Sequence, residues 1–195
     1  MGALVDIGNL IIQTFFNMFI LAVLLRLLLQ LARADFFNPI SQFLVKVTSP
    51  ALAPLRRIVP SIAGIDMASI VLVVGLQILG TVLLVLLRGY DIPNPLSMLI
   101  WALLGTAGMV INIYFVAILF SIVVSWVSPG SYNPAVILLH QLTEPVMAPF
   151  RKLLPSLGGL DLSPIFVFLT INVLQILLGH LASASGLPAA YVIGM

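Results

Sequence analysis

The stretch that decides the fold runs from residue 38 to residue 66 and reads NPISQFLVKVTSPALAPLRRIVPSIAGID. The pattern returns 95 positions later, where residues 133–161 read NPAVILLHQLTEPVMAPFRKLLPSLGGLD. Twelve of the 29 paired positions are identical without a gap, and they include Asn, Thr, Arg and Asp, which compositional bias in so apolar a chain would not align. Self-similarity at a fixed offset is the signature of a repeat architecture. The chain is therefore a tandem duplication.

The composition around these motifs is typical of a membrane protein. Of the 195 residues, 62% are hydrophobic and 7% are charged, and residues 92–143 contain no Asp, Glu, Lys or Arg. Soluble globular domains carry about 25% charged residues, so this chain has too few charges to cover a surface that faces water. The net charge of +2 is too small a basic excess to predict nucleic-acid binding. Because the chain has no cysteine, disulfides and thiolate metal sites are excluded.

Each repeat predicts two membrane-spanning helices separated by a polar motif loop. The apolar runs place the spans at residues 8–32, 66–87, 98–127 and 161–181, and the motif loops at residues 33–65 and 128–160. Each span reaches the roughly 20 residues that cross a bilayer. An even number of spans per repeat gives both copies the same orientation, so both motif loops lie on one face of the membrane. We predict an all-α polytopic membrane protein with repeat 1 at residues 1–91 and repeat 2 at residues 92–195, joined in one integrated membrane domain.

The basic residues predict which side of the membrane the motif loops occupy. Six of the eight lie in these loops: Arg33, Lys46, Arg56, Arg57, Arg151 and Lys152. Loops with an excess of Lys and Arg stay in the cytoplasm. We therefore expect cytoplasmic motif loops, with both chain termini on the opposite side.

The motif loops are too apolar to be ordinary solvent loops. Residues 40–47 and 51–59 are largely apolar, and prolines at 50 and 54 interrupt the backbone. Proline removes a helical hydrogen bond, and an unpaired backbone group is tolerated at the membrane only against protein or headgroup water. We expect short helices here that are either interfacial or re-entrant.

These residues together form a recognisable pattern. It consists of Arg26 in the first span, DFFNPISQ at residues 35–42, TSPALAPLRRIVP at residues 48–60 and GID at residues 64–66. The pattern resembles the YggT family of bacterial inner-membrane proteins, also found in plastids, over nearly the whole chain. The resemblance implies a multi-pass inner-membrane protein, so the far side, where the basic residues lead us to expect both termini, is the periplasm. It also implies links to cell division or to osmotic and potassium stress, and in plastids to haem attachment on a cytochrome and to nucleoid distribution, without one common biochemical activity.

The second repeat departs from the first at two places. Ser121 stands where the first repeat has Arg26, and residues 130–132 read GSY in place of DFF at residues 35–37. A mechanism with two-fold symmetry is therefore not expected.

A basic element with flanking prolines occurs in both motif loops. It carries Arg56 and Arg57 in the first copy and Arg151 and Lys152 in the second. Such cations could bind anionic lipid headgroups or an acidic protein partner, each contributing about 1 kcal/mol near an anionic surface. They could equally serve only as a topology signal, since cytoplasmic loops are generally basic.

Asp66 and Asp161 occupy equivalent positions before the second span of each repeat. Paired carboxylates could perform acid–base chemistry, as in an intramembrane aspartyl protease. Ser69 follows the first Asp by three residues, however, and Pro164 lies in the first turn after the second, which is an N-cap signature. We therefore expect both to cap helices. Since the two histidines stand alone and no nucleophile motif, phosphate loop or metal-ligand cluster is visible, we expect neither an enzyme nor a cofactor.

Polar side chains inside the spans indicate contacts between helices. Arg26 and Gln30 share one face of the first span, where an unpaired Arg would cost at least about 2.5 kcal/mol at mid-bilayer. Arg26 could snorkel to the interface, or it could form an ion pair with Asp66 or Asp161. Gln77 and Asn172 lie mid-span, and we expect each to bond across a helix interface. The paired Asn38 and Asn133, at the start of each repeated motif, are further candidate structural or coupling residues.

Two classes of function fit these observations. The first is an integral membrane protein that organises or anchors a membrane-associated complex, with anionic lipids and a protein partner in the membrane. The alternative is an ion or small-solute channel or transporter. A conduit usually needs several intramembrane ionisable groups, and Arg26 is the clear one here, so we favour the first class.

Overall fold

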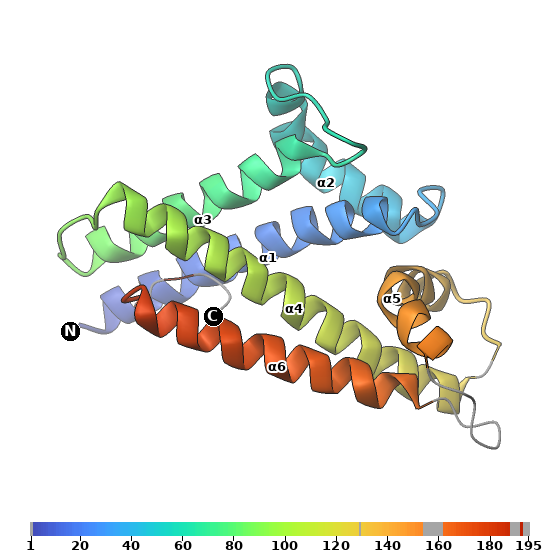
Figure 1. The fold of residues 1–195 in the computed structure, drawn as a ribbon. Coiled ribbons are helices and arrows are strands. Elements are labelled where there is room, and N and C mark those ends of the chain that lie inside the picture. Colours follow the sequence, from blue (N-terminus) through green and yellow to red (C-terminus); the bar gives the residue numbers. More distant parts are fainter. Residues whose placement is uncertain (1, 129, 154–161, 188–191, 193–195) are drawn as a thin grey trace.

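The computed structural model describes residues 2–128, 130–153, 162–187 and 192. Within these residues the regular secondary structure consists of six helices, whose arrangement can be followed in Figure 1. They are α1 (Ala3–Leu31), α2 (Pro39–Arg56), α3 (Met67–Leu87), α4 (Pro95–Val127), α5 (Pro134–Leu153) and α6 (Ser163–Ala184). The predicted all-α class is confirmed.

Four of the helices are long and apolar enough to cross a bilayer, as predicted. They are α1, α3, α4 and α6, with 29, 21, 33 and 22 residues. At 1.5 Å per residue α4 is about 50 Å long, well beyond the ~30 Å of the hydrocarbon core. α1 and α4 must therefore tilt in the membrane or project from it.

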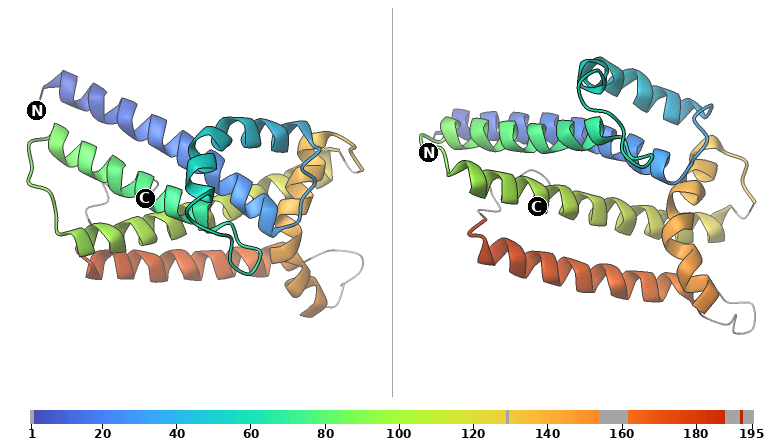
Figure 2. Two further views of the ribbon diagram at one scale, coloured as in Figure 1. Left: turned by 90° about the horizontal axis from the view of Figure 1, so that it is seen from above. Right: turned by 45° about the horizontal axis from the view of Figure 1, so that its top comes forward.

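The four spans lie in a row in the order α1, α3, α4, α6 (Figure 2). α1 and α4 run in one direction and α3 and α6 in the other, so the two repeats are parallel. α3 packs against α4 and thereby joins the repeats. As a result, α2 and α5 both lie at the same end of the bundle, which we call the motif end.

The motif segments are continuous helices, which corrects the expectation of a backbone broken by proline. α2 runs through Pro50 and Pro54, and α5 runs through Pro145 and Pro149. All four prolines are exposed. The carbonyl groups that lose a helical N–H partner to proline therefore face outward, while the opposite, buried face packs on the spans and holds the helix together.

The interior is filled by apolar side chains from both repeats. Ile20, Val23 and Leu24 of α1 are buried with Val73 of α3 and Ile113 of α4. A second cluster joins α4, α5 and α6. In lipid such close packing acts mainly through dispersion, because the surrounding acyl chains are as apolar as the core.

Candidate functional site

A polar pocket opens at the motif end of the first repeat. Its volume is about 470 Å³, and its walls come from α1, α2 and the segments that follow each of them. The residues that line it are Arg26, Gln30, Phe36, Val45, Arg56, Ser61 and Asp66. Four residues singled out by the sequence pattern are thus brought together: Arg26, Gln30, Arg56 and Asp66.

Arg26 turns toward α2 and is 6% exposed. Its Nη1 donates to Thr48 Oγ1 at 2.7 Å and to Ser49 Oγ at 3.2 Å. The Thr48 hydroxyl in turn donates to the carbonyl oxygen of Leu44 at 2.7 Å. The guanidinium therefore ties the end of α1 to the middle of α2, instead of snorkelling outward.

The direct ion pair expected between Arg26 and Asp66 does not form. Asp66 Oδ2 instead accepts hydrogen bonds from Nε and Nη2 of Arg56 and from Ser69 Oγ, the last at 2.8 Å. The fork of Arg56 fits the carboxylate, and it reaches Asp66 from α2 as the chain turns back into α3. In the part of the chain that the structure describes, no carboxylate lies within salt-bridge distance of Arg26.

Asp66 occupies the N-cap position of α3, but it does not cap the helix with its side chain. Its carboxylate is held by the side chains of Arg56 and Ser69, whereas an N-cap residue usually binds backbone N–H groups. Burial acts to raise the pKa of Asp66, and the hydrogen bonds from Arg56 and Ser69 together with the charge of Arg56 outweigh it. The pKa of Asp66 is therefore lowered, and the group stays ionised. Asp161, its second-repeat equivalent, lies outside the described residues.

The second repeat builds different contacts at the equivalent positions. Ser121, in place of Arg26, lies 3.3 Å from Nδ1 of His140 through its hydroxyl oxygen. Arg151, the equivalent of Arg56, pairs with Glu144 at 2.7 Å. Both partners of this pair are well exposed, so it stabilises the fold little. Among the described residues, the second repeat thus has no counterpart of the buried Arg26 that lines the polar pocket of the first.

The two asparagines at the start of the motif helices have unequal roles. Asn38 caps α2 by accepting from the N–H of Ile40 at 2.9 Å, and its Nδ2 donates to the carbonyl oxygen of Pro134 at 2.8 Å. Asn133 accepts from the N–H of Ala135 at 2.9 Å. Asn38 therefore couples the two motif helices, whereas Asn133 acts locally.

Sequence reasoning missed Thr48 and Ser49 as the partners of Arg26. The sequence did carry a signal for Thr48, which is the spacing of one helix face. The structure buries this face of α2, and its members are Ser41, Leu44, Thr48 and Leu52. A hydroxyl within such a face needs a partner, and a cation on the adjacent span supplies one. Position 49 carries a further signal, because it is polar in both repeats. Its second-repeat equivalent, Glu144, also accepts a hydrogen bond from an arginine, in that case Arg151.

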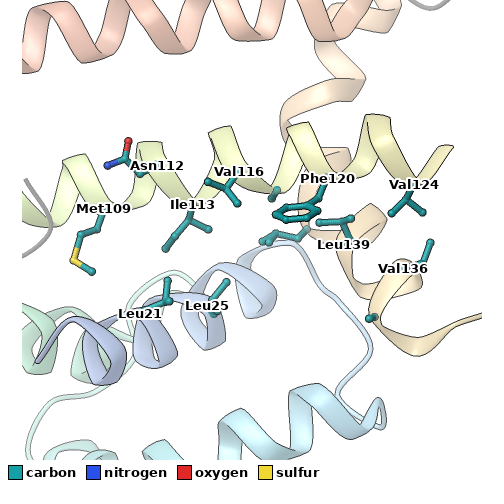
Figure 3. A pocket seen from close by; sticks show the side chains of 13 residues that line it. Leu21, Leu25, Met109, Asn112, Ile113, Val116, Phe120, Val124, Val136 and Leu139 are labelled. Atoms are coloured by element: carbon teal, nitrogen blue, oxygen red, sulfur yellow. The ribbon is translucent and has the colours of Figure 1, made fainter. Parts of the chain in front are cut away.

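A second pocket, of about 690 Å³, lies between the repeats and is lined by α1, α4 and α5. Figure 3 shows Leu21 and Leu25 of α1 facing Ile113 and Phe120 of α4 across it. Asn112 also lines it, and its Oδ1 accepts from Nε2 of Gln175 at 3.1 Å. So apolar a lining suits acyl chains or apolar side chains, and it offers few groups to coordinate an ion.

Comparison with known proteins identifies the family of this chain. The sequence pattern of the CCB3/YggT family matches residues 5–87 and again residues 100–182. The chain belongs to the CCB3/YggT family. Both matches coincide with the two structural repeats, since each covers one span, one motif helix and a second span.

Two bacterial relatives are similar to this chain over nearly their whole length, and a chloroplastic relative is similar over a shorter stretch. An uncharacterized protein of Pseudomonas aeruginosa is 47% identical over 180 residues, covering 91% of both chains. The YggT protein of Escherichia coli K12 is 35% identical over 181 residues, covering 90% of this chain and 91% of its own. A chloroplastic YlmG homolog of Arabidopsis thaliana is 40% identical over 65 residues, which is 32% of this chain and 24% of that protein. No solved structure matches the chain.

No metal centre is evident in the residues that the structure describes. No three His, Asp or Glu side chains among them lie close enough to hold a metal ion. The chemistry of the site is that of two guanidinium groups, one of them already neutralised by Asp66. Such a site can bind an anion or hold helices together.

Proposed function

We propose that this CCB3/YggT protein organises or anchors a membrane-associated complex in the bacterial inner membrane, at the division or osmotic-stress machinery that the family resemblance implies. The motif end, which we place in the cytoplasm, is the surface that holds anionic lipid headgroups and a protein partner. The observation that carries the proposal is the pair of amphipathic helices, α2 and α5, that lie across this one end of the bundle.

The exposed side of these helices has the character of an interfacial surface. Ile58 and Leu153 are exposed there, and each directly follows an exposed cation, Arg57 and Lys152. Apolar side chains beside Lys and Arg enter the headgroup region, where the apolar parts bury and the cations meet anionic lipid. The pair of helices α2 and α5 therefore forms a platform that rests on the membrane surface and presents its edge to the cytoplasm.

The polar pocket supports the same function. Arg26 is buried and bonded to hydroxyl groups, so its charge is not matched within the described residues. A buried cation without a counter-charge is costly, and a headgroup phosphate in the pocket would supply one. Gln30 and Ser61, which also line the pocket, add polar groups for the phosphate oxygens.

The alternative, a channel or transporter, would need a polar path along the bundle. The interior between α1, α3 and α4 is instead filled by Ile20, Val23, Leu24 and Ile113. The pocket between the repeats is apolar as well. These features favour an anchor over a conduit.

The proposal is tested by isolating the protein in mild detergent with co-purifying partners and anionic lipid quantified by mass spectrometry. The wild-type protein should retain a stoichiometric partner and phosphatidylglycerol. The double variant Arg57→Gln/Lys152→Gln should lose most of both, and the charge-preserving Arg57→Lys/Lys152→Arg should keep them. If the Gln variant retained partner and lipid as well as the wild type does, these cations would serve only as a topology signal. A wild-type protein without any stoichiometric partner would contradict the anchoring function.

A further inference from the structure

The row of spans ends on two faces that no other helix covers. α1 and α6 form its outer members, and among the described residues they make no contact with each other (Figure 2). The junction inside the chain is α3 against α4, which is the second span of one repeat against the first span of the next. Each outer helix therefore carries one half of such a junction.

The α6 half can be identified by the 95-residue offset. On α3 the residues Gln77, Thr81 and Leu84 share one face and are all buried. The Gln77 side chain points into the junction, where Nε2 donates to Sδ of Met109 on α4 at 3.5 Å. The equivalent α6 residues are Asn172, Ile176 and Gly179, and all three are exposed.

The same 95-residue offset identifies the half of the junction that α1 carries. Five buried residues of α4 share the face that contains Met109: Met98, Ala102, Gly105, Met109 and Ile113. Their α1 equivalents are Ala3, Ile7, Leu10, Thr14 and Met18, and every one of them is exposed. Both halves of the junction are thus present in each chain and open to a partner.

Asn172 indicates that lipid is not the intended neighbour of this face. It lies mid-span, and the interface bond expected for it is absent, because its Nδ2 donates at 2.7 Å to the carbonyl oxygen of Phe168 in its own helix. Asn172 is exposed, and its amide oxygen has no hydrogen-bond donor among the described residues, at a depth where hydrocarbon offers none. Polar side chains at such positions hold membrane helices together.

We propose that α6 of one chain docks against α1 of a second copy and repeats the α3–α4 junction between molecules. Because the repeats are parallel, α6 and the incoming α1 run antiparallel, as α3 and α4 do. The register of the internal junction then sets Asn172 opposite Thr14 of the second copy, where the Thr14 hydroxyl donates to the Asn172 amide oxygen. The interface joins two different surfaces, so it builds head-to-tail rows or closed rings instead of a two-fold dimer.

The absence of native cysteine makes disulfide cross-linking in membranes a direct test. In the variant Thr14→Cys/Asn172→Cys, oxidation should yield a ladder of species at multiples of the 21.0 kDa chain. Each single-cysteine variant should stay monomeric or stop at a dimer. The matched control Thr14→Cys/Leu174→Cys places the second thiol at a similar depth on the opposite side of α6, and it should give no ladder.

The internal pair Gln77→Cys/Met109→Cys is the positive control for the cross-linking reaction and for the fold. It should cross-link within one chain and change the electrophoretic mobility of the monomer without producing a ladder. If that pair reacts while Thr14→Cys/Asn172→Cys remains monomeric, the intermolecular junction is refuted. A ladder of equal strength from the Leu174 control would also refute it, by showing that collisions are unspecific. The lipid and partner retention described above does not depend on this outcome.

Discussion

Arg26 bonds partners on α2 that the sequence did not predict. Its guanidinium is buried and bonds two hydroxyl groups of α2, while the nearby carboxylate of Asp66 is taken by Arg56. The hydrogen bonds to Thr48 and Ser49 join two helices that meet only at the motif end. The stability of the contact between α1 and α2 should therefore depend on the hydroxyl groups as much as on the arginine.

The substitution Thr48→Val removes the hydroxyl and keeps the shape of the side chain. It leaves a buried guanidinium N–H without its acceptor, which costs about 1–3 kcal/mol. For a chain of this size we expect the melting temperature in detergent to fall by about 2–4 °C per kcal/mol. Thr143→Val is the matched control, because the Thr143 hydroxyl bonds carbonyl groups of its own helix and should be nearly dispensable. An equal loss in both variants would contradict the role of Arg26.

The carboxylate of Asp66 should make stability depend on pH at the acid end. Its pKa is lowered in the folded protein relative to the ordinary Asp value of about 3.9, so its contribution is fully present above that value. The contribution is lost as the pH falls through the lower, folded pKa. Melting temperatures of the wild type and Asp66→Asn should therefore differ at pH 7, and the difference should shrink progressively as the pH falls below about 3.9. A difference that persists unchanged in acid would show that Asp66 acts through packing alone.

At the scale of the element, α2 and α5 are helices that tolerate two prolines each. Their buried residues lie on one face, and the prolines lie on the other, where carbonyl groups without helical partners meet water or headgroups. Packing on the spans therefore decides the conformation, against the intrinsic preference of the sequence.

Pro50→Ala tests this account of α2. If the helix is continuous, alanine restores an N–H donor to the carbonyl of Lys46 and removes the penalty that proline carries in a helix, so stability should rise by about 1–3 kcal/mol. Leu52→Ala, on the fully buried face, should instead cost about 2–5 kcal/mol. Thermal melts in detergent compare the two. A melting temperature lowered by Pro50→Ala would mean that the segment needs a break at this point.

At the scale of the whole molecule, parallel repeats bring both motif helices to one end of the bundle. Asn38 then joins the repeats through the carbonyl of Pro134, and the N–H of Asp35 donates to Oε1 of Gln141 at 3.0 Å. These bonds hold α2 and α5 in a single platform. The arrangement requires both motif helices to face the same compartment.

Fusions to alkaline phosphatase determine which compartment that is. The enzyme is active only outside the cytoplasm, so fusions after Met195 or within residues 91–95 should be active. Fusions at Lys46 or Lys152 should be inactive, because the basic residues keep the motif end inside. Activity at Lys152 alone would break the parallel arrangement, and activity at both would invert the orientation.

Hydropathy and repetition are local properties, and so the sequence by itself determined the four spans, the duplication and the common side of the two motifs. Each follows from the length of an apolar run or from an even count of helices, without knowledge of how the helices pack. The row order of the spans and the choice of partners for Arg26, Asp66 and Asn172 were decided only by the tertiary structure. Long polar side chains have several candidate partners within reach, and the crossing of helices selects among them. The same packing left Asn172 exposed where its equivalent Gln77 is buried.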